Sequence, residues 1–214
     1  MLSDLDCANL CQSQYDGTDI FDVSDSIAGV DYAIKFYPDC AAVIFEGSHD
    51  LPDWISNFDA VMLDVPDFAG VERGFYQGIP DVAVKVLPML SKSKPVYVTG
   101  HSRGAAHAHI FAAMLVKQGF KVIVTVFGSP RPGDARLAAI LAPFPNRSYR
   151  NYQDFDHQDF VCDVPFDLTI VAPFVHPYKQ KIINMAPAPN DPWGLLARHH
   201  LFLYTAALQG YPHG

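Results

Sequence analysis

The sequence predicts an α/β fold, a single mostly parallel sheet flanked by helices, from two observations. A strand-like run at 94–100 leads into an Ala-rich helical stretch at 103–119 and then into another strand-like run at 121–128. A strand, a helix and a strand within about 35 residues are typical of the repeating unit of a parallel sheet. In addition, no internal repeat, low-complexity tract or Gly/Ser linker divides the 214 residues, so we expect one domain over residues 1–214.

The remaining elements follow from local patterns. Residues 31–48 predict two strands joined by a turn at Pro38 and Asp39, because β-branched and aromatic residues flank a turn dipeptide. Residues 59–65 predict a third strand, and the apolar spacing of 75–90 predicts a helix that contains two prolines. Gly119 is expected to end the Ala-rich helix. Residues 165–196 are Pro-rich and irregular, with one strand-like piece at 181–185.

Composition restricts the class of partner and the location. A net charge of −8, from 23 acidic residues against 15 Lys and Arg, argues against nucleic acid and anionic lipid surfaces and favours a neutral substrate. No apolar run approaches the roughly 20 residues of a membrane-spanning helix, so we expect no stable membrane insertion. Residues 1–17 are acidic where a signal peptide is basic, and they lack an apolar core. We therefore expect a cytoplasmic location, with release by lysis or by a non-Sec route left open.

The cysteines give no sign of a metal centre. Cys7, Cys11, Cys40 and Cys162 form no CxxC pair and no Cys/His cluster with zinc-site spacing. We expect reduced, mostly buried thiols, and we leave a relationship between Cys7 and Cys11 open. The chain also lacks a dinucleotide-binding glycine fingerprint and a P-loop. The prediction is therefore a protein with no metal and no cofactor.

The motif that carries chemistry is "GHSRG", at the junction between the strand-like run and the helix. Gly100, Ser102 and Gly104 fit GxSxG, the nucleophile elbow of α/β hydrolases, in which a serine occupies a sharp strand-to-helix turn. The following helix directs its N-terminus at the reaction centre, so the backbone N–H of Arg103 can face a developing oxyanion. Ser102 is therefore the candidate nucleophile.

A serine nucleophile needs a base and an acid, and in this architecture both follow it in the order Ser, Asp or Glu, His. The downstream acids are Asp134, Asp154, Asp156, Asp159, Asp163, Asp167 and Asp191. The downstream imidazoles are His107, His109, His157, His176, His199, His200 and His213. His107 and His109 lie on the helix after Ser102, where surface or packing roles are expected, and His213 lies in the terminal tail. Spacing alone does not choose among the others.

Five segments, in this order along the chain, carry a family resemblance. They are "VIFEGSHDLPDWISNF", "GVERGFYQGI", "VYVTGHSRGAAHAHIFA", "VTVFGSPRPGD" and "DFDHQDFVCDVP". From about Ala41 to Tyr204 the chain resembles the class 3 lipases, the fungal triacylglycerol lipase-like α/β hydrolases. It departs from the family's GHSLGGA pattern at Arg103, which replaces a leucine, and at Ala105, which replaces a glycine.

The resemblance implies a role for each matching residue. Ser102 corresponds to the nucleophile and Asp159 to the acid, with Asp156 as the weaker alternate. In "RHHLFLY" the register makes His199 the base, and a shift by one residue would choose His200 instead.

The same resemblance places Ser48 in the oxyanion hole beside the Arg103 amide. Residues 51–58 correspond to the lid of the fungal enzymes, although Trp54 can equally be a core residue. Pro130, Arg131 and His176 correspond to structural positions.

The expected activity is hydrolysis of a small-molecule or lipid carboxylic ester through an acyl-enzyme, as in a lipase or esterase. The alternatives on the same scaffold are a small-ester carboxylesterase, a phospholipase, an acyltransferase and a catalytically silent binding module. Acid/base glycosidase chemistry from Asp154, Asp156 and Asp159 is disfavoured because it leaves the elbow and the C-terminal histidines unexplained. The oligomeric state is not determined by any of these patterns.

Overall fold

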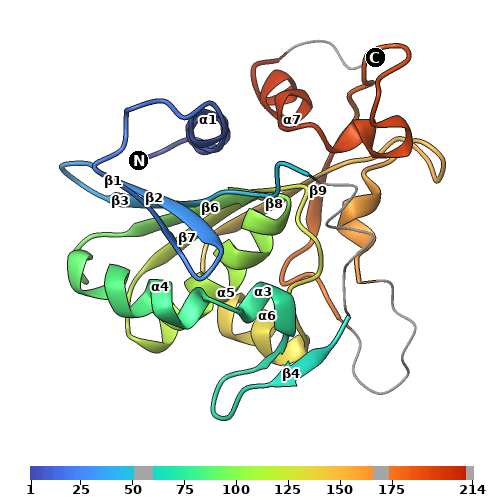
Figure 1. Cartoon of the computed structure of the whole chain (residues 1–214). Coiled ribbons are helices and arrows are strands. Elements are labelled where there is room, and N and C mark those ends of the chain that lie inside the picture. Colours follow the sequence, from blue (N-terminus) through green and yellow to red (C-terminus); the bar gives the residue numbers. More distant parts are fainter. Residues whose placement is uncertain (51–59, 166–173, 211–214) are drawn as a thin grey trace.

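One central sheet organises the computed structural model, which describes residues 1–50, 60–165 and 174–210 (Figure 1). The sheet runs in the order β1 (Val23–Ile27), β2 (Val30–Phe36), β3 (Ala41–Phe45), β6 (Val96–His101), β7 (Val122–Phe127), β8 (Asn146–Asn151) and β9 (Gln180–Ile183). From β3 to β9 neighbouring strands are parallel, whereas β1, β2 and β3 form an antiparallel meander. The predicted fold class, a mostly parallel central sheet flanked by helices, is confirmed.

Helices cover both faces of this sheet (Figure 1). On one face lie α3 (Arg73–Tyr76), α4 (Ile79–Val86), α5 (Arg103–Lys117) and α6 (Ala135–Leu141). On the other face lie α1 (Asp4–Tyr15) and α7 (Leu201–Leu208), which contact each other. Successive side chains of a strand point to opposite faces of the sheet, so one strand contributes to both cores. In β3, Val43 packs on the face covered by α4 and α5, and Ile44 packs on the face covered by α1 and α7.

The central strand–helix–strand unit forms as the sequence predicts. β6, α5 and β7 follow one another, and β6 pairs in parallel with β7 from Val96 to His101. The helix stops two residues before Gly119, whose φ of +82° is the left-handed conformation that ends many helices. The predicted turn at Pro38 and Asp39 joins β2 to β3, and the Tyr37 N–H closes it on the Cys40 carbonyl at 2.9 Å.

Two predicted elements differ from the structure. The strand expected at 59–65 is the short β4 (Met62–Asp64), which pairs with β5 (Gly70–Glu72) in a separate sheet. The helix expected at 75–90 is divided into α3, α4 and the 3₁₀ turn η1 (Leu87–Met89). Gly78, at a φ of +81°, separates α3 from α4. Pro80 lies in the first turn of α4 and Pro88 in that of η1, where the N–H that proline lacks has no partner within the helix.

Several elements were not predicted: α1, β1, α6 and β8. Helix α1 starts at a capping box in which Ser3 and Asp6 exchange hydrogen bonds, and it buries Cys7 and Cys11 against the sheet. Cys7, Cys11, Cys40 and Cys162 are all buried free thiols, as expected.

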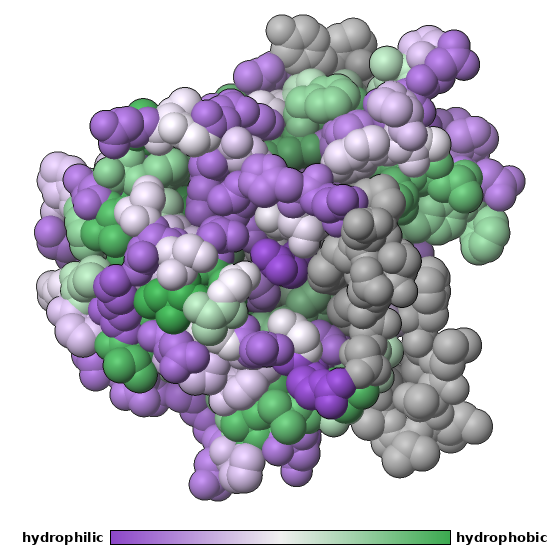
Figure 2. Space-filling model, in the orientation of Figure 1, coloured by the Kyte–Doolittle hydropathy of each residue, from purple (hydrophilic) through white to green (hydrophobic). Residues whose placement is uncertain are grey.

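The surface of the described residues is mixed in character. Hydrophobic side chains are scattered among hydrophilic ones over the face seen in Figure 2. None of the helices in the three described ranges combines the length and the apolar character that crossing a membrane requires.

Helix α5 buries two imidazoles beneath the sheet. His107 packs edge-on against the rings of Phe45 and Phe75, and His109 contacts Tyr178. Burial, which disfavours the charged form, lowers the pKa of His107 to about 3, and the Arg103 charge adds to the effect. Burial likewise lowers the pKa of His109 to about 3. Of the surface and packing roles expected for His107 and His109, the structure shows packing.

These histidines make stability depend on pH. An unfolded imidazole binds a proton below a pH of about 6.5, whereas folded His107 does so only near its lowered pKa, so stability is lost as the pH falls. Replacing His107 by Phe should flatten the pH dependence of the unfolding free energy by about 1 kcal/mol per pH unit between pH 6 and pH 4. Urea titrations at several pH values measure it. Equal slopes for the two proteins between pH 7 and pH 8 serve as the internal control, and equal slopes below pH 6 would contradict the account.

Candidate active site

Ser102 occupies a strained turn at the end of β6. Its φ of 59° and ψ of −132° lie outside the regions that L-residues ordinarily adopt, and helix α5 starts at the next residue. The Ser102 N–H donates to the Phe127 carbonyl at 3.0 Å, which ties the turn to β7. This is the conformation that the nucleophile elbow requires.

The two glycines of the motif are required by close backbone approach. A Cβ at Gly100 would lie 2.3 Å from the Gly104 carbonyl oxygen, and a Cβ at Gly104 would lie 2.2 Å from the Phe45 carbonyl oxygen. Any side chain at either position would displace main chain, which is more costly than moving a flexible side chain. The elbow therefore depends on both glycines for steric reasons.

His199 and Asp159 form a buried pair beside this turn. The His199 Nδ1 lies 2.7 Å from the Asp159 Oδ2, and the two side chains are 1% and 0% exposed. Asp159 precedes the 3₁₀ turn η2 (Phe160–Asp163), and His199 ends the 3₁₀ turn η3 (Gly194–His199). Segments 40 residues apart in the chain thus meet at the carboxyl ends of the parallel strands.

The buried Asp159 carboxylate is held charged by its partners. Burial by itself would raise its pKa, yet the pKa lies below the ordinary value because the His199 imidazole and the hydrogen bonds from His199 and Tyr204 stabilise the carboxylate. The Tyr204 hydroxyl donates to Oδ2 at 2.5 Å and the Val161 N–H donates to Oδ1 at 3.0 Å. A charged Asp159 can therefore orient the His199 ring and stabilise its protonated form.

His101, the residue before the serine, fixes the backbone of His199. Its Nε2 donates to the His199 carbonyl at 2.7 Å, which leaves Nδ1 to accept from the Tyr15 hydroxyl at 3.1 Å. Burial, followed by the neighbouring His199, lowers the pKa of His101 to about 3. His101 is therefore neutral near pH 7, and its ring links α1 to η3 through one hydrogen bond to each.

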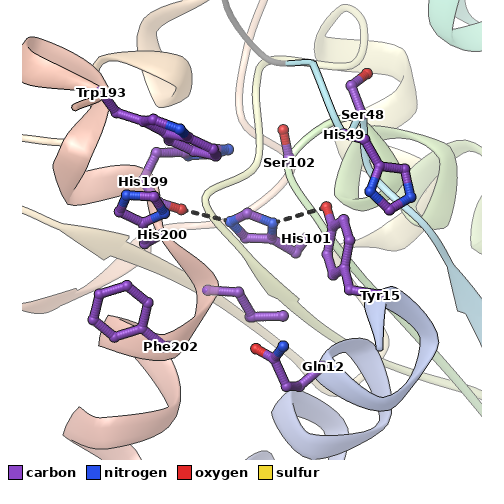
Figure 3. A pocket seen from close by; sticks show the side chains of 11 residues that line it. Gln12, Tyr15, Ser48, His49, His101, Ser102, Trp193, His199, His200 and Phe202 are labelled. Atoms are coloured by element: carbon purple, nitrogen blue, oxygen red, sulfur yellow. Dashed lines mark hydrogen bonds between the residues drawn. The ribbon is translucent and has the colours of Figure 1, made fainter. Parts of the chain in front are cut away.

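Ser102 and His199 face one pocket (Figure 3). Its volume is about 220 Å³. The lining residues are Gln12, Tyr15, Ser48, His49, His101, Ser102, Trp193, His199, His200, Leu201 and Phe202. Within the described part of the chain, the buried Ser102 Oγ and His199 Nε2 have no protein hydrogen-bond partner. The two atoms are therefore not hydrogen-bonded to each other in this structure, and neither is paired with another group of the described residues.

The two residues expected at the oxyanion hole lie next to this pocket. Ser48 is half-buried and lines it. Arg103 is the first residue of α5, where the N–H groups of the first turn lack partners within the helix. The Arg103 guanidinium extends toward the β1–β2 turn, where Nη2 donates to the Gly29 carbonyl at 3.4 Å. The polar side chain that replaces the family's leucine therefore contacts the hairpin and is not part of the pocket lining.

The other candidates are placed elsewhere. His200 lines the pocket, but its Nε2 pairs with Asp191 at 3.1 Å. Asp156 is exposed, and Asp154 pairs with the exposed His157 at 2.7 Å. The His176 Nε2 donates to the Cys162 carbonyl at 2.8 Å, which is a structural contact.

The remaining candidate acids serve the scaffold. Asp134 caps α6, and Asp163 pairs with Arg150 at 2.6 Å. Asp167, His213 and the lid expected at residues 51–58 lie outside the described residues.

Asn151, at the end of β8, connects the segments that carry Asp159 and His199. Its Nδ2 donates to the carbonyls of Met185 at 2.8 Å and Arg198 at 3.1 Å, and its Oδ1 accepts from the Met185 N–H at 3.0 Å. Its carbonyl accepts from the Asp159 N–H at 2.7 Å, and its N–H donates to the Tyr204 hydroxyl at 3.1 Å. One fully buried side chain and its backbone thus position both Asp159 and the residue before His199.

Sequence reasoning missed Tyr15, His101, Asn151 and Trp193 at this site. Tyr15 comes from α1, and the signal in the sequence for the start of this helix is Ser3 followed three residues later by Asp6. Asn151 had no local signal, because its role depends on contacts with residues 34 and 47 positions away.

Comparison with known proteins gives a consistent picture. Residues 42–169 match a family model described as lipase (class 3). The chain is 34% identical over 116 residues to a secreted mono- and diacylglycerol lipase 1 from Fusarium solani. That match covers 50% of this chain and 35% of the relative, so the chain spans about a third of the length of the curated relative it matches.

Solved structures of fungal lipases share the fold. A triacylglyceride lipase from Rhizomucor miehei superposes with a TM-score of 0.67 at 21% identity, over 84% of this chain and 77% of that one. A mono- and diacylglycerol lipase from Aspergillus oryzae superposes with a TM-score of 0.64 at 21% identity, over 89% and 83% of the two chains.

One expectation is overturned by these comparisons. The prediction of a cytoplasmic location is wrong, because the curated relative is a secreted lipase. The prediction rested on the missing signal-peptide pattern in residues 1–17, and such an absence carries no information about location.

Replacing Asn151 by Ala should weaken the whole site. The change removes four side-chain hydrogen bonds, to both backbone groups of Met185 and to the carbonyl and guanidinium of Arg198, so the free energy of unfolding should fall by roughly 2–4 kcal/mol. Denaturant titration measures the loss. Asn146→Ala, on the same strand, removes one half-buried hydrogen bond to Phe144 and should cost less than about 1 kcal/mol. Equal losses in the two variants would show that Asn151 has no special role.

Proposed function

This chain belongs to the class 3 lipase family, and we propose that it hydrolyses carboxylic esters with Ser102 as nucleophile, His199 as base and Asp159 as the orienting acid. The observation that carries the proposal is the buried His199–Asp159 hydrogen bond of 2.7 Å facing the same pocket as the strained Ser102. A strained serine and a buried histidine–aspartate pair that face one pocket are the groups that acyl transfer by a serine requires.

The reaction proceeds in two halves. His199 Nε2 takes the Ser102 proton while Oγ attacks the ester carbonyl, and the charged Asp159 stabilises the imidazolium that forms. The tetrahedral intermediate collapses, and His199 returns the proton to the departing alcohol. Water, deprotonated by the same histidine, then attacks the acyl-enzyme and releases the carboxylic acid and free Ser102.

The negative charge on the carbonyl oxygen needs donors next to Ser102. In our proposal these donors are the backbone N–H of Arg103 and Ser48, which lies in the same lining. Each such donor contributes about 3 kcal/mol of transition-state stabilisation in comparable sites. The guanidinium of Arg103 has no part in this step, since the donor is a backbone amide.

The substrate class follows from the family at the level of lipid esters. The names of the relatives make mono-, di- and triacylglycerols the first esters to test. A small-ester carboxylesterase, a phospholipase and an acyltransferase use the same residues, and rates over a series of alcohols and acyl chain lengths separate them. A catalytically silent binding module would show no covalent chemistry at Ser102.

The test of the activity is covalent labelling. A fluorophosphonate ester should form one adduct, located on Ser102 by peptide mass spectrometry, because the reagent requires an activated serine. His199→Ala should abolish the adduct and His200→Ala should retain it, since His199 is bonded to Asp159 whereas His200 is bonded to Asp191. Loss of the adduct in His200→Ala but not in His199→Ala would show that His200 is the base. A folded protein that forms no adduct would refute the proposed activity.

The role of the acid can be separated from that of its neighbours. Asp159→Asn should lower kcat by roughly 10³ to 10⁴, as expected when the imidazole loses its orienting carboxylate. Asp156→Asn is the matched control, because Asp156 is exposed and is not among the described residues that contact His199. This variant should retain the wild-type kcat. Ester hydrolysis rates of the two variants decide the assignment, and a large loss in Asp156→Asn would contradict it.

A further inference from the structure

The lining of the Ser102 pocket is rich in rings (Figure 3). The side chains that carry a ring are Tyr15, His49, His101, Trp193, His199, His200 and Phe202. Among the lining residues in the described ranges, Leu201 is the one aliphatic side chain. A pocket built to hold an alkyl chain has no need of planar surfaces, so this composition points to a planar ligand group.

Three of these rings form an ordered wall, which we call the ring stack: Trp193, His200 and Phe202. The Trp193 and His200 rings lie 4.0 Å apart with an interplanar angle of 30°, and His200 and Phe202 lie 5.2 Å apart at 28°. Asp191 lies at one end of the stack, where its carboxylate pairs with the His200 ring and accepts from the backbone N–H of Trp193 at 2.9 Å. The wall is thus fixed by stacking and by hydrogen bonds.

The dimensions of the pocket limit what can enter. Its volume of about 220 Å³ is below the roughly 300–1,000 Å³ of typical sites for drug-sized ligands. A cavity of about 150 Å³ is sufficient for a benzene molecule. The described lining therefore has room for one six-membered ring and the ester group.

On the basis of the proposed ester hydrolysis, we propose that the ring stack makes this pocket select acyl groups that end in an aromatic ring over unbranched alkyl acyl groups with the same number of carbons. A rigid ring loses less conformational freedom on binding than a flexible chain. Contact between aromatic rings also adds a gain beyond the buried area, equivalent to about twofold to tenfold in rate for each ring pair.

The test compares two esters with nine acyl carbons, methyl 3-phenylpropanoate and methyl nonanoate, below their solubility limits. Both have a saturated carbon next to the carbonyl, so their intrinsic reactivities are similar and the kcat/KM ratio reports the pocket. Trp193→Leu and Phe202→Leu remove rings from the stack but keep apolar side chains. Phe155→Leu is the matched control, because Phe155 is 76% exposed and does not line the pocket.

We expect the wild-type kcat/KM ratio to favour the phenyl ester by about fivefold or more. The ratio should fall by about threefold to tenfold in each ring-stack variant and stay unchanged in Phe155→Leu. A wild-type ratio of one or less, or a ratio unaffected by Trp193→Leu and Phe202→Leu, would overturn the proposal. So would a protein whose Ser102 reacts with a fluorophosphonate but which hydrolyses neither ester. Failure of that labelling reaction would instead refute the ester hydrolysis on which the proposal rests.

Discussion

The site depends on one constraint, a carboxylate buried completely inside the protein. Asp159 is 0% exposed, and a charge in that position is tolerated only when hydrogen bonds replace water. Three segments supply the partners of the carboxylate: His199 from η3, Tyr204 from α7 and Val161 from η2. The backbone N–H of Asp159 donates to the Asn151 carbonyl at the end of β8. Forming the acid site therefore requires that the C-terminal third of the chain be folded onto the end of the sheet.

A second constraint acts from the opposite side of the pocket. The Ser102 turn is strained, and it is held by β7 and by the glycines that let the main chain of β3 and α5 approach closely. His101 joins the two constraints, because its ring connects the Tyr15 hydroxyl of α1 to the carbonyl of His199. Helix α1 lies outside residues 42–169, which match the family, yet it contributes two side chains to the pocket.

Features that adjacent residues determine could be predicted from the sequence, whereas features that depend on contacts between distant segments could not. The strand–turn–helix around Ser102 is encoded by adjacent residues, with glycines that permit the turn and alanines that favour the helix, so both its position and its conformation were predictable. The acid and the base could be named only through the resemblance, because nothing local distinguishes Asp159 from Asp156, or His199 from His200. The structure separates each pair by burial and by partner: Asp159 is buried and Asp156 exposed, while His199 bonds to Asp159 and His200 to Asp191. Asn151 and the ring stack were not predictable, since they arise from contacts between distant segments or from ring orientations.

The central claim is that His199 holds a proton on Nδ1 that is bonded to the Asp159 carboxylate. Proton NMR of the protein labelled with nitrogen-15 in its histidines observes that proton directly, because a buried and strongly hydrogen-bonded imidazole N–H exchanges slowly and resonates far downfield. The account predicts one such resonance that disappears in His199→Ala and moves in Asp159→Asn but is unchanged in Asp191→Asn. A resonance that responds to Asp191→Asn and ignores Asp159→Asn would place the proton on His200 and contradict the assignment of the base.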